Sequence, residues 1–187
     1  MSTDAAPPDT AAEPSLEVLD ALQRRVLWLA TSIVHHANRV RTTPSGVKVG
    51  GHQASSASMV SVMTALWFAH LRAPDRVSVK PHAAPVLHAI NYLLGRLDPK
   101  YLTELRAFGG LQSYPSRAKD PDPVDFSTGS VGIGATATLW SALAHRYVAE
   151  HFEVPRGGRQ IAPSSSSASP SSATWRPPWG TSKCPET

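Results

Sequence analysis

The sequence predicts an α/β protein that is rich in helix, with a partial parallel sheet and disordered tails. Its 187 residues leave room for one domain of ordinary size. Apolar residues recur at steps of three or four over residues 16–37, which is typical of an amphipathic helix. Residues 76–80 (RVSVK) alternate like a short strand, and residues 159–162 (RQIA) read as the beginning of another.

The first elements follow in order along the chain. Residues 1–15 are rich in proline, alanine and acidic residues, so we expect a disordered tail. Ser15 is placed to cap the first helix, and residues 42–46 (TTPSG) end it with turn residues. A second helix is predicted from Ser55 or Ser56 to about Leu71, with an apolar stripe that faces the core.

The later elements are marked by proline and glycine. Pro85 fits the first turn of a third helix that continues to residue 94, and Pro99 opens a short helix. Residues 111–128 contain three prolines and are predicted to form a long ordered loop. A last helix is expected over residues 135–150. Its inward-facing residues are predicted to be Leu139, Ala142, Leu143 and Tyr147.

The segment after residue 162 has a different composition. Its 25 residues, 163–187, include eight serines and five prolines, which cannot bury enough apolar surface to offset the entropy of ordering. We therefore expect a disordered tail. One interpretation is a natural flexible tail; the other, which the abrupt break after the incipient strand favours, is a change of reading frame or gene structure near residue 163.

Composition and charge exclude several classes of function. The net charge is +4, and the basic residues come singly or in pairs with no aromatic residues between them, unlike a nucleic-acid-binding surface. The single cysteine, Cys184, cannot form an internal disulfide and fits a reducing compartment. The sequence shows no secretory signal and no run of about 20 apolar residues that would span a membrane. We expect a cytoplasmic protein.

Two histidines lie beside turns that precede predicted helices. His52 follows Gly50-Gly51, where the backbone can approach a ligand closely and a helix start favours anions. It is either a proton-transferring residue or a capping residue of the turn. His82 lies between the predicted strand at 76–80 and a helix, at an edge where α/β folds bind ligands, or else it is a surface loop residue.

The remaining candidates are weaker. His88 is predicted to be a packing residue on the third helix. The histidines at 35, 36, 70, 145 and 151 lack metal-type spacing, so no metal site is predicted. The glycine-rich turn at 129–134 (GSVGIG) matches neither a nucleotide-binding fingerprint nor a phosphate loop, and as an isolated motif it is explained better by close packing against its helix.

The order of these motifs carries more information than any one of them. The runs GGHQASSAS, KPHAAPVLHAINYLLGRL, LQSYPS and FSTGSVGIGATATLWSALAHRYVAEH appear in that sequence. Over residues 16–162 the chain resembles the N-terminal, diphosphate-binding domain of the homodimeric pyruvate dehydrogenase decarboxylating component and, more distantly, transketolase. The resemblance implies an incomplete thiamine-diphosphate-binding fold and divides the chain into a tail (1–15), this partial domain (16–162) and a second tail (163–187).

The resemblance also implies roles for individual residues. His52 and His82 match the two active-site histidines, and Ser55 and Tyr114 match residues of the cofactor and substrate pocket. Gly132 and Gly134 match the glycine turn that lies against the cofactor. Three residues depart from the family pattern: Lys80 stands where a glutamine is usual, Pro81 replaces a glycine and Val131 a methionine.

The cofactors that the resemblance implies are thiamine diphosphate and magnesium, with a 2-oxo acid or a ketose sugar as substrate. The family's GDG motif and the asparagine that hold magnesium are not found after Ala162. We therefore expect a truncated, inactive fragment of a 2-oxo acid dehydrogenase. The alternatives are a transketolase-like enzyme that transfers two-carbon units between sugar phosphates, and a degenerate or regulatory fragment. A homodimer, or pairing with a full-length homologue, is the expected assembly.

Overall fold

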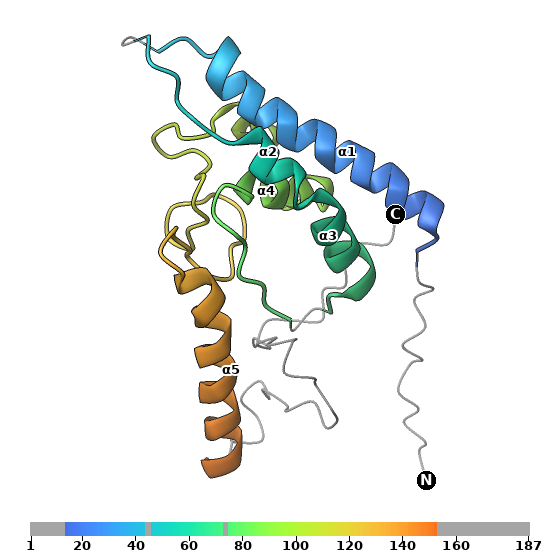
Figure 1. Ribbon diagram of the computed structural model, residues 1–187, viewed down its shortest axis with the longest axis vertical. Coiled ribbons are helices and arrows are strands. Elements are labelled where there is room, and N and C mark those ends of the chain that lie inside the picture. Colours follow the sequence, from blue (N-terminus) through green and yellow to red (C-terminus); the bar gives the residue numbers. More distant parts are fainter. Residues whose placement is uncertain (1–13, 44–45, 73–74, 153–187) are drawn as a thin grey trace.

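The computed structural model describes residues 14–43, 46–72 and 75–152. Four helices, α1 (Leu16–His35), α2 (Gln53–Ala57), α3 (Val60–Ala65) and α4 (Ala84–Leu93), pack together, and α5 (Ile133–His151) extends away from them (Figure 1). One-turn π-helices continue two of these elements: η1 (His36–Val40) follows α1, and η2 (Leu66–His70) follows α3. A short 3₁₀ helix, η3 (Pro99–Thr103), follows α4.

The first helix begins where its sequence predicts. Ser15 lies in the extended region, and its hydroxyl accepts a hydrogen bond from the backbone N–H of Val18, so it caps α1. The buried face of α1 is its C-terminal half, where Val26, Leu29 and Ile33 pack on α3, α4 and the following loops. The spacing of apolar residues therefore identified the helix and the inner face of its C-terminal half, whereas Leu16 at its start is exposed.

The most buried element is α4. Every residue from Ala84 to Asn91 is buried, because α1, α2 and α3 cover one side of the helix and the long loop at 111–128 covers another. Pro85 occupies its first turn, as predicted. A helix enclosed on all sides holds apolar residues around its circumference. The two polar residues within it, His88 and Asn91, therefore need partners.

The second predicted helix is broken. It forms as α2, α3 and η2, and a turn at Ser58 and Met59 separates the first two. The Ser58 hydroxyl donates to the carbonyl oxygen of Ser55 at 2.9 Å, and the Met59 N–H donates to Ser56 at 3.0 Å. Serine side chains compete in this way with the helical hydrogen-bond pattern, which apolar periodicity alone does not reveal.

The prediction of a partial parallel sheet is wrong for the part of the chain that the structure describes, which contains no strand. Residues 76–80 form no strand, and side chains of the long loop instead bond two of their backbone groups. The Val77 N–H donates to Asp125 at 2.9 Å, and the Val79 carbonyl accepts from Thr128 at 2.9 Å. The predicted strand at 159–162 and the predicted tails, apart from residues 14 and 15, lie outside the described residues.

The last helix also differs from its prediction. It forms over Ile133–His151, but none of its residues is buried, and Leu139, Leu143 and Tyr147 are about half exposed rather than inward. Its apolar stripe, which also includes Trp140, has no partner among the described residues that buries it. Periodicity establishes which side of a helix is apolar; it does not supply the surface that covers that side.

Candidate functional site

The loop that carries His52 is held against η1, which continues α1. The Gly50 N–H donates to the side-chain oxygen of Asn38 at 2.9 Å. Gly50 and Gly51 both have positive φ, at 90° and 122°, which glycine adopts without strain. A Cβ on Gly51 would lie 3.1 Å from Val34, so the double glycine permits this close approach. His52 follows as the N-cap position of α2, with an exposed ring.

His82 is fixed by its backbone. Its φ of 64° lies in the left-handed region, which is uncommon for a residue other than glycine. Two hydrogen bonds hold it: its N–H donates to the Ser113 carbonyl at 2.9 Å, and its carbonyl accepts from the Ser56 hydroxyl at 2.9 Å. Backbone strain of this kind costs about 1–3 kcal/mol and persists where the surroundings hold it in place. These contacts direct the imidazole of His82 toward α2 and the loop at 113–114.

Three predicted site residues meet at this point. The rings of His52 and His82 have centroids 4.3 Å apart and are tilted by 54°. The Nε2 atom of His82 lies 3.1 Å from the hydroxyl of Tyr114, whose ring centroid is 4.8 Å from that of His82. The chain thus brings together side chains that are 30 and 32 residues apart in sequence. Such a group can share or transfer a proton.

The local electrostatics favour a neutral His82. Burial lowers its pKa below the ordinary value, and the neighbouring basic groups His52, Arg106 and Lys80 lower it further. A neutral imidazole can accept a proton at one nitrogen while the other donates. At near-neutral pH, His82 is therefore a proton acceptor rather than a fixed cation.

Arg106 links the segments that carry these side chains. Its Nε atom donates to the Ser113 hydroxyl at 2.7 Å, and its Nη1 atom donates to the Val49 carbonyl at 2.8 Å. A Cβ on Gly50 would overlap this guanidinium. The arginine therefore joins the His52 loop to the loop that receives His82. Sequence analysis missed this role, because nothing local to Arg106 indicates it.

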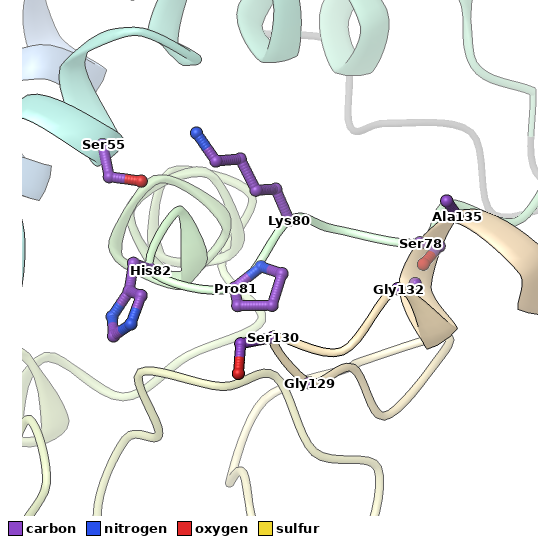
Figure 2. Close-up of a pocket in the computed structure, with 10 residues that line it drawn as sticks. Ser55, Ser78, Lys80, Pro81, His82, Gly129, Ser130, Gly132 and Ala135 are labelled. Atoms are coloured by element: carbon purple, nitrogen blue, oxygen red, sulfur yellow. The ribbon is translucent and has the colours of Figure 1, made fainter.

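A pocket of about 520 Å³ opens beside His82 (Figure 2). Four of the predicted site residues line it: Ser55, His82, Gly132 and Gly134. His52 and Tyr114 are not among the lining residues but contact His82. Gly132 has a φ of 87° where α5 begins, and a Cβ on Gly134 would lie 3.3 Å from Ser78. The glycine turn therefore forms one wall of the pocket.

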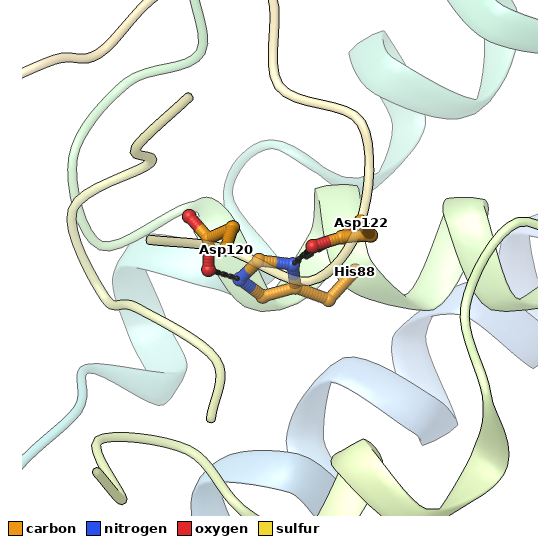
Figure 3. Close-up of side chains that lie close together, drawn as sticks. All are labelled: His88, Asp120 and Asp122. Atoms are coloured by element: carbon orange, nitrogen blue, oxygen red, sulfur yellow. Dashed lines mark hydrogen bonds and ion pairs between the residues drawn. The ribbon is translucent and has the colours of Figure 1, made fainter. Parts of the chain in front are cut away.

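A second polar cluster was not predicted (Figure 3). His88, which we expected to be a packing residue, is fully buried and contacts Asp122 at 2.9 and 3.0 Å through Nδ1. Its Nε2 lies 3.0 Å from the Gln112 carbonyl and 3.7 Å from Asp120. Because carboxylates and carbonyls only accept hydrogen bonds, both ring nitrogens must donate, so His88 is an imidazolium. Burial opposes the charge of His88, but the hydrogen bond and charge of Asp122, helped by Asp120, raise its pKa.

The acidic oxygens of this cluster are engaged by hydrogen bonds within the fold. Its three potential ligand atoms lie within 4.8 Å of one another. However, both oxygens of Asp120 accept backbone N–H groups at 2.7 Å, and both oxygens of Asp122 are bonded to His88. The pocket lining contains no carboxylate. The described lining of the pocket therefore offers imidazole, amine and hydroxyl groups but no carboxylate of the kind that holds a magnesium ion.

No helix among the described residues has the length and apolar character needed to cross a lipid bilayer.

The sequence of this chain is similar to part of several known bacterial proteins. No family model matches it. It is 33% identical over 154 residues to the pyruvate dehydrogenase E1 component of Mycobacterium tuberculosis, covering 74% of this chain and 16% of that protein. The corresponding proteins of Cupriavidus necator and Escherichia coli K12 are 30% and 27% identical, over 72% and 73% of this chain and 15% and 16% of their own lengths. About three quarters of this chain is therefore similar to a short stretch of proteins named pyruvate dehydrogenase E1 component.

Proposed function

We propose that residues 16–162 form part of a thiamine-diphosphate-dependent 2-oxo acid dehydrogenase, in which His52 and His82 transfer protons. The observation that carries the proposal is the 4.3 Å separation of these two rings beside a pocket. The relatives, named pyruvate dehydrogenase E1 component, support the class of enzyme. Thiamine diphosphate supplies an electron sink for carbon–carbon cleavage when it is bound.

The chain's own residues have defined parts in this proposal. His82 is neutral and takes up a proton, because burial and then the basic groups around it lower its pKa. Tyr114 holds the Nε2 side of His82 through its hydroxyl. The ring of His52 lies against the ring of His82. In this proposal, His52 donates a hydrogen bond to a developing oxyanion. Ser55 and the glycine turn shape the pocket wall.

We further propose that this chain alone has no dehydrogenase activity and binds the cofactor weakly. The described residues that line the pocket include no carboxylate to hold magnesium, although the cofactor's diphosphate requires the metal. A second chain, either another copy or a full-length homologue, completes the site in this view.

Titration with thiamine diphosphate tests the proposal. The histidine ring signals are followed by NMR as the cofactor is added, with and without magnesium. We expect the signals of His52 and His82 to shift at millimolar cofactor, while the exposed His35 on α1 does not respond. The variants H52Q and H82Q should abolish the response, and H35Q should retain it.

Two results would count against the proposal. Micromolar affinity in the presence of magnesium would show that the chain alone forms a complete cofactor site. Uniform shifts of all histidines, or none at His52 and His82 at saturating cofactor, would remove these residues from the site.

A further inference from the structure

The pocket beside His82 has an excess of positive charge. Lys80 lines it together with His82, and no acidic residue is among the lining residues (Figure 2). None of the ion pairs among the described residues involves Lys80. The guanidinium of Arg106 adds positive charge close to His82. A pocket with this charge distribution attracts anions.

The same pocket presents hydrogen-bonding groups without partners. The hydroxyls of Ser55, Ser78 and Ser130 line it. The Ser78 oxygen and the Nδ1 atom of His82 are both buried and have no hydrogen-bond partner among the described residues. Buried polar atoms are normally paired, so an exception at a pocket wall indicates a group that a ligand satisfies.

The two observations together identify the class of ligand. We propose that Lys80 and His82 make this pocket selective for a 2-oxo acid that carries a second carboxylate. The 2-oxo acid part of this inference rests on the proposed function, whereas the dianionic part rests on the pocket itself. Lys80 provides one permanent positive charge, and His82 provides a second when it gains a proton. Two carboxylates match these two charges, and the serine hydroxyls donate to their remaining oxygens.

The proposal predicts that ligand binding is coupled to proton uptake. The charged or titratable groups that face His82 are His52, Arg106, Lys80 and Tyr114. None of them is an acid that would favour the imidazolium, and burial together with three of them lowers the pKa of His82. A bound carboxylate places a negative charge beside His82 and raises the pKa of His82. The free chain therefore holds a neutral His82, and the complex holds a protonated one.

Isothermal titration calorimetry of the full chain, without thiamine diphosphate, measures both effects. The ligands are 2-oxoglutarate, pyruvate and inorganic phosphate, and repeating each titration in buffers of different ionisation heats gives the number of protons taken up. We expect 2-oxoglutarate to bind more tightly than pyruvate or phosphate, with proton uptake near neutral pH.

Variants assign the effect to residues. K80Q should weaken 2-oxoglutarate binding at least about tenfold, the size of one hydrogen bond to a charged group, and leave pyruvate binding nearly unchanged. K80R should retain most of the affinity because it keeps the charge. K100Q is the matched control, because Lys100 is exposed and far along the chain beside Asp98. H82Q should abolish proton uptake.

The outcomes separate this inference from the proposed function. Lys80 is exposed, so K80Q should keep the native circular dichroism spectrum. Equal losses of 2-oxoglutarate affinity in K80Q and K100Q would overturn the inference. So would tighter binding of pyruvate or of phosphate than of 2-oxoglutarate. If the chain binds 2-oxoglutarate with proton uptake while the NMR signals of His52 and His82 do not shift with thiamine diphosphate, that result would support the dianion pocket and contradict the proposed function.

Discussion

The buried ion pair between His88 and Asp122 offers the clearest test of how this fold is held together. The substitution Asp122→Ala removes both carboxylate oxygens that contact His88 Nδ1, at 2.9 and 3.0 Å. It also removes the 2.7 Å hydrogen bond from the side-chain nitrogen of Asn91. Two donors on the most buried helix would then lose a charged partner, and the loop at 111–128 would lose part of its attachment to α4.

The expected cost follows from the complete burial of this pair. Both side chains are 0% exposed, so solvent does not screen their interaction. Removing one partner of a buried pair costs about 3–5 kcal/mol, because the other is left as an uncompensated charge. His88 can release its proton once Asp122 is gone, which places our expectation near 3 kcal/mol. A domain with a total stability of about 5–15 kcal/mol would be severely weakened.

Urea unfolding followed by far-ultraviolet circular dichroism measures the loss. Asp20→Ala is the matched control, because Asp20 pairs with Arg24 on the exposed face of α1, with side chains 52% and 69% exposed. Such pairs contribute about 0.3–0.5 kcal/mol. If Asp122→Ala leaves the chain unfolded, Asp122→Asn retains an acceptor for His88 and should give an intermediate loss. Equal stabilities for Asp122→Ala and Asp20→Ala would refute the account of the buried pair.

Three further predictions concern the same fold. The raised pKa of His88 means that its stabilisation is complete below the unfolded-state pKa of about 6.5 and is lost as the pH rises through the higher folded value. The urea concentration at the unfolding midpoint should therefore fall as the pH rises through this range. A midpoint that does not change with pH would contradict the stabilisation by the His88–Asp122 pair. Gly50→Ala should destabilise by about 1–3 kcal/mol, because its Cβ overlaps Arg106 and its φ is positive, whereas Gly46→Ala meets no atom and should cost about 1 kcal/mol. Equal thermal shifts for the two glycine variants would refute the close contact. Trp140→Lys should leave stability within about 0.5 kcal/mol, since Trp140 is 64% exposed, and should reduce self-association in light scattering; a large loss of stability would show that α5 is covered.

The helices were predictable because their signals are local. Ser15 caps α1, and Pro85 occupies the first turn of α4. The spacing of Val26, Leu29 and Ile33 marked the face that packs inward. These features depend on residues within a few positions of one another, so the sequence carries them directly.

The missing sheet shows where local signals fail. A strand needs a neighbouring strand to bond its backbone groups. In residues 76–80, the backbone groups of Val77 and Val79 bond instead to the side chains of Asp125 and Thr128. The sequence around Val77 and Val79 alternates as a strand does, but alternation says nothing about which groups will satisfy the backbone. The exposed apolar stripe of α5 was wrongly predicted to face inward for a related reason.

The candidate site was predictable only in part. The resemblance singled out His52, His82 and Tyr114, and the structure places them together. The connecting role of Arg106 and the ion pair of His88 depend on contacts between residues that are 7 to 57 positions apart. No spacing rule links such residues, so they become visible only in the folded chain.

The central claim is that His52 and His82 lie against each other beside one pocket. A nuclear Overhauser experiment on the isotopically labelled chain tests it most directly, because it reports the proximity of the two imidazole rings. A ring-to-ring cross-peak between His52 and His82, lost in H52Q, is the result that the 4.3 Å centroid separation predicts. The absence of that cross-peak in a chain whose α1 and α4 signals show native packing would contradict the claim.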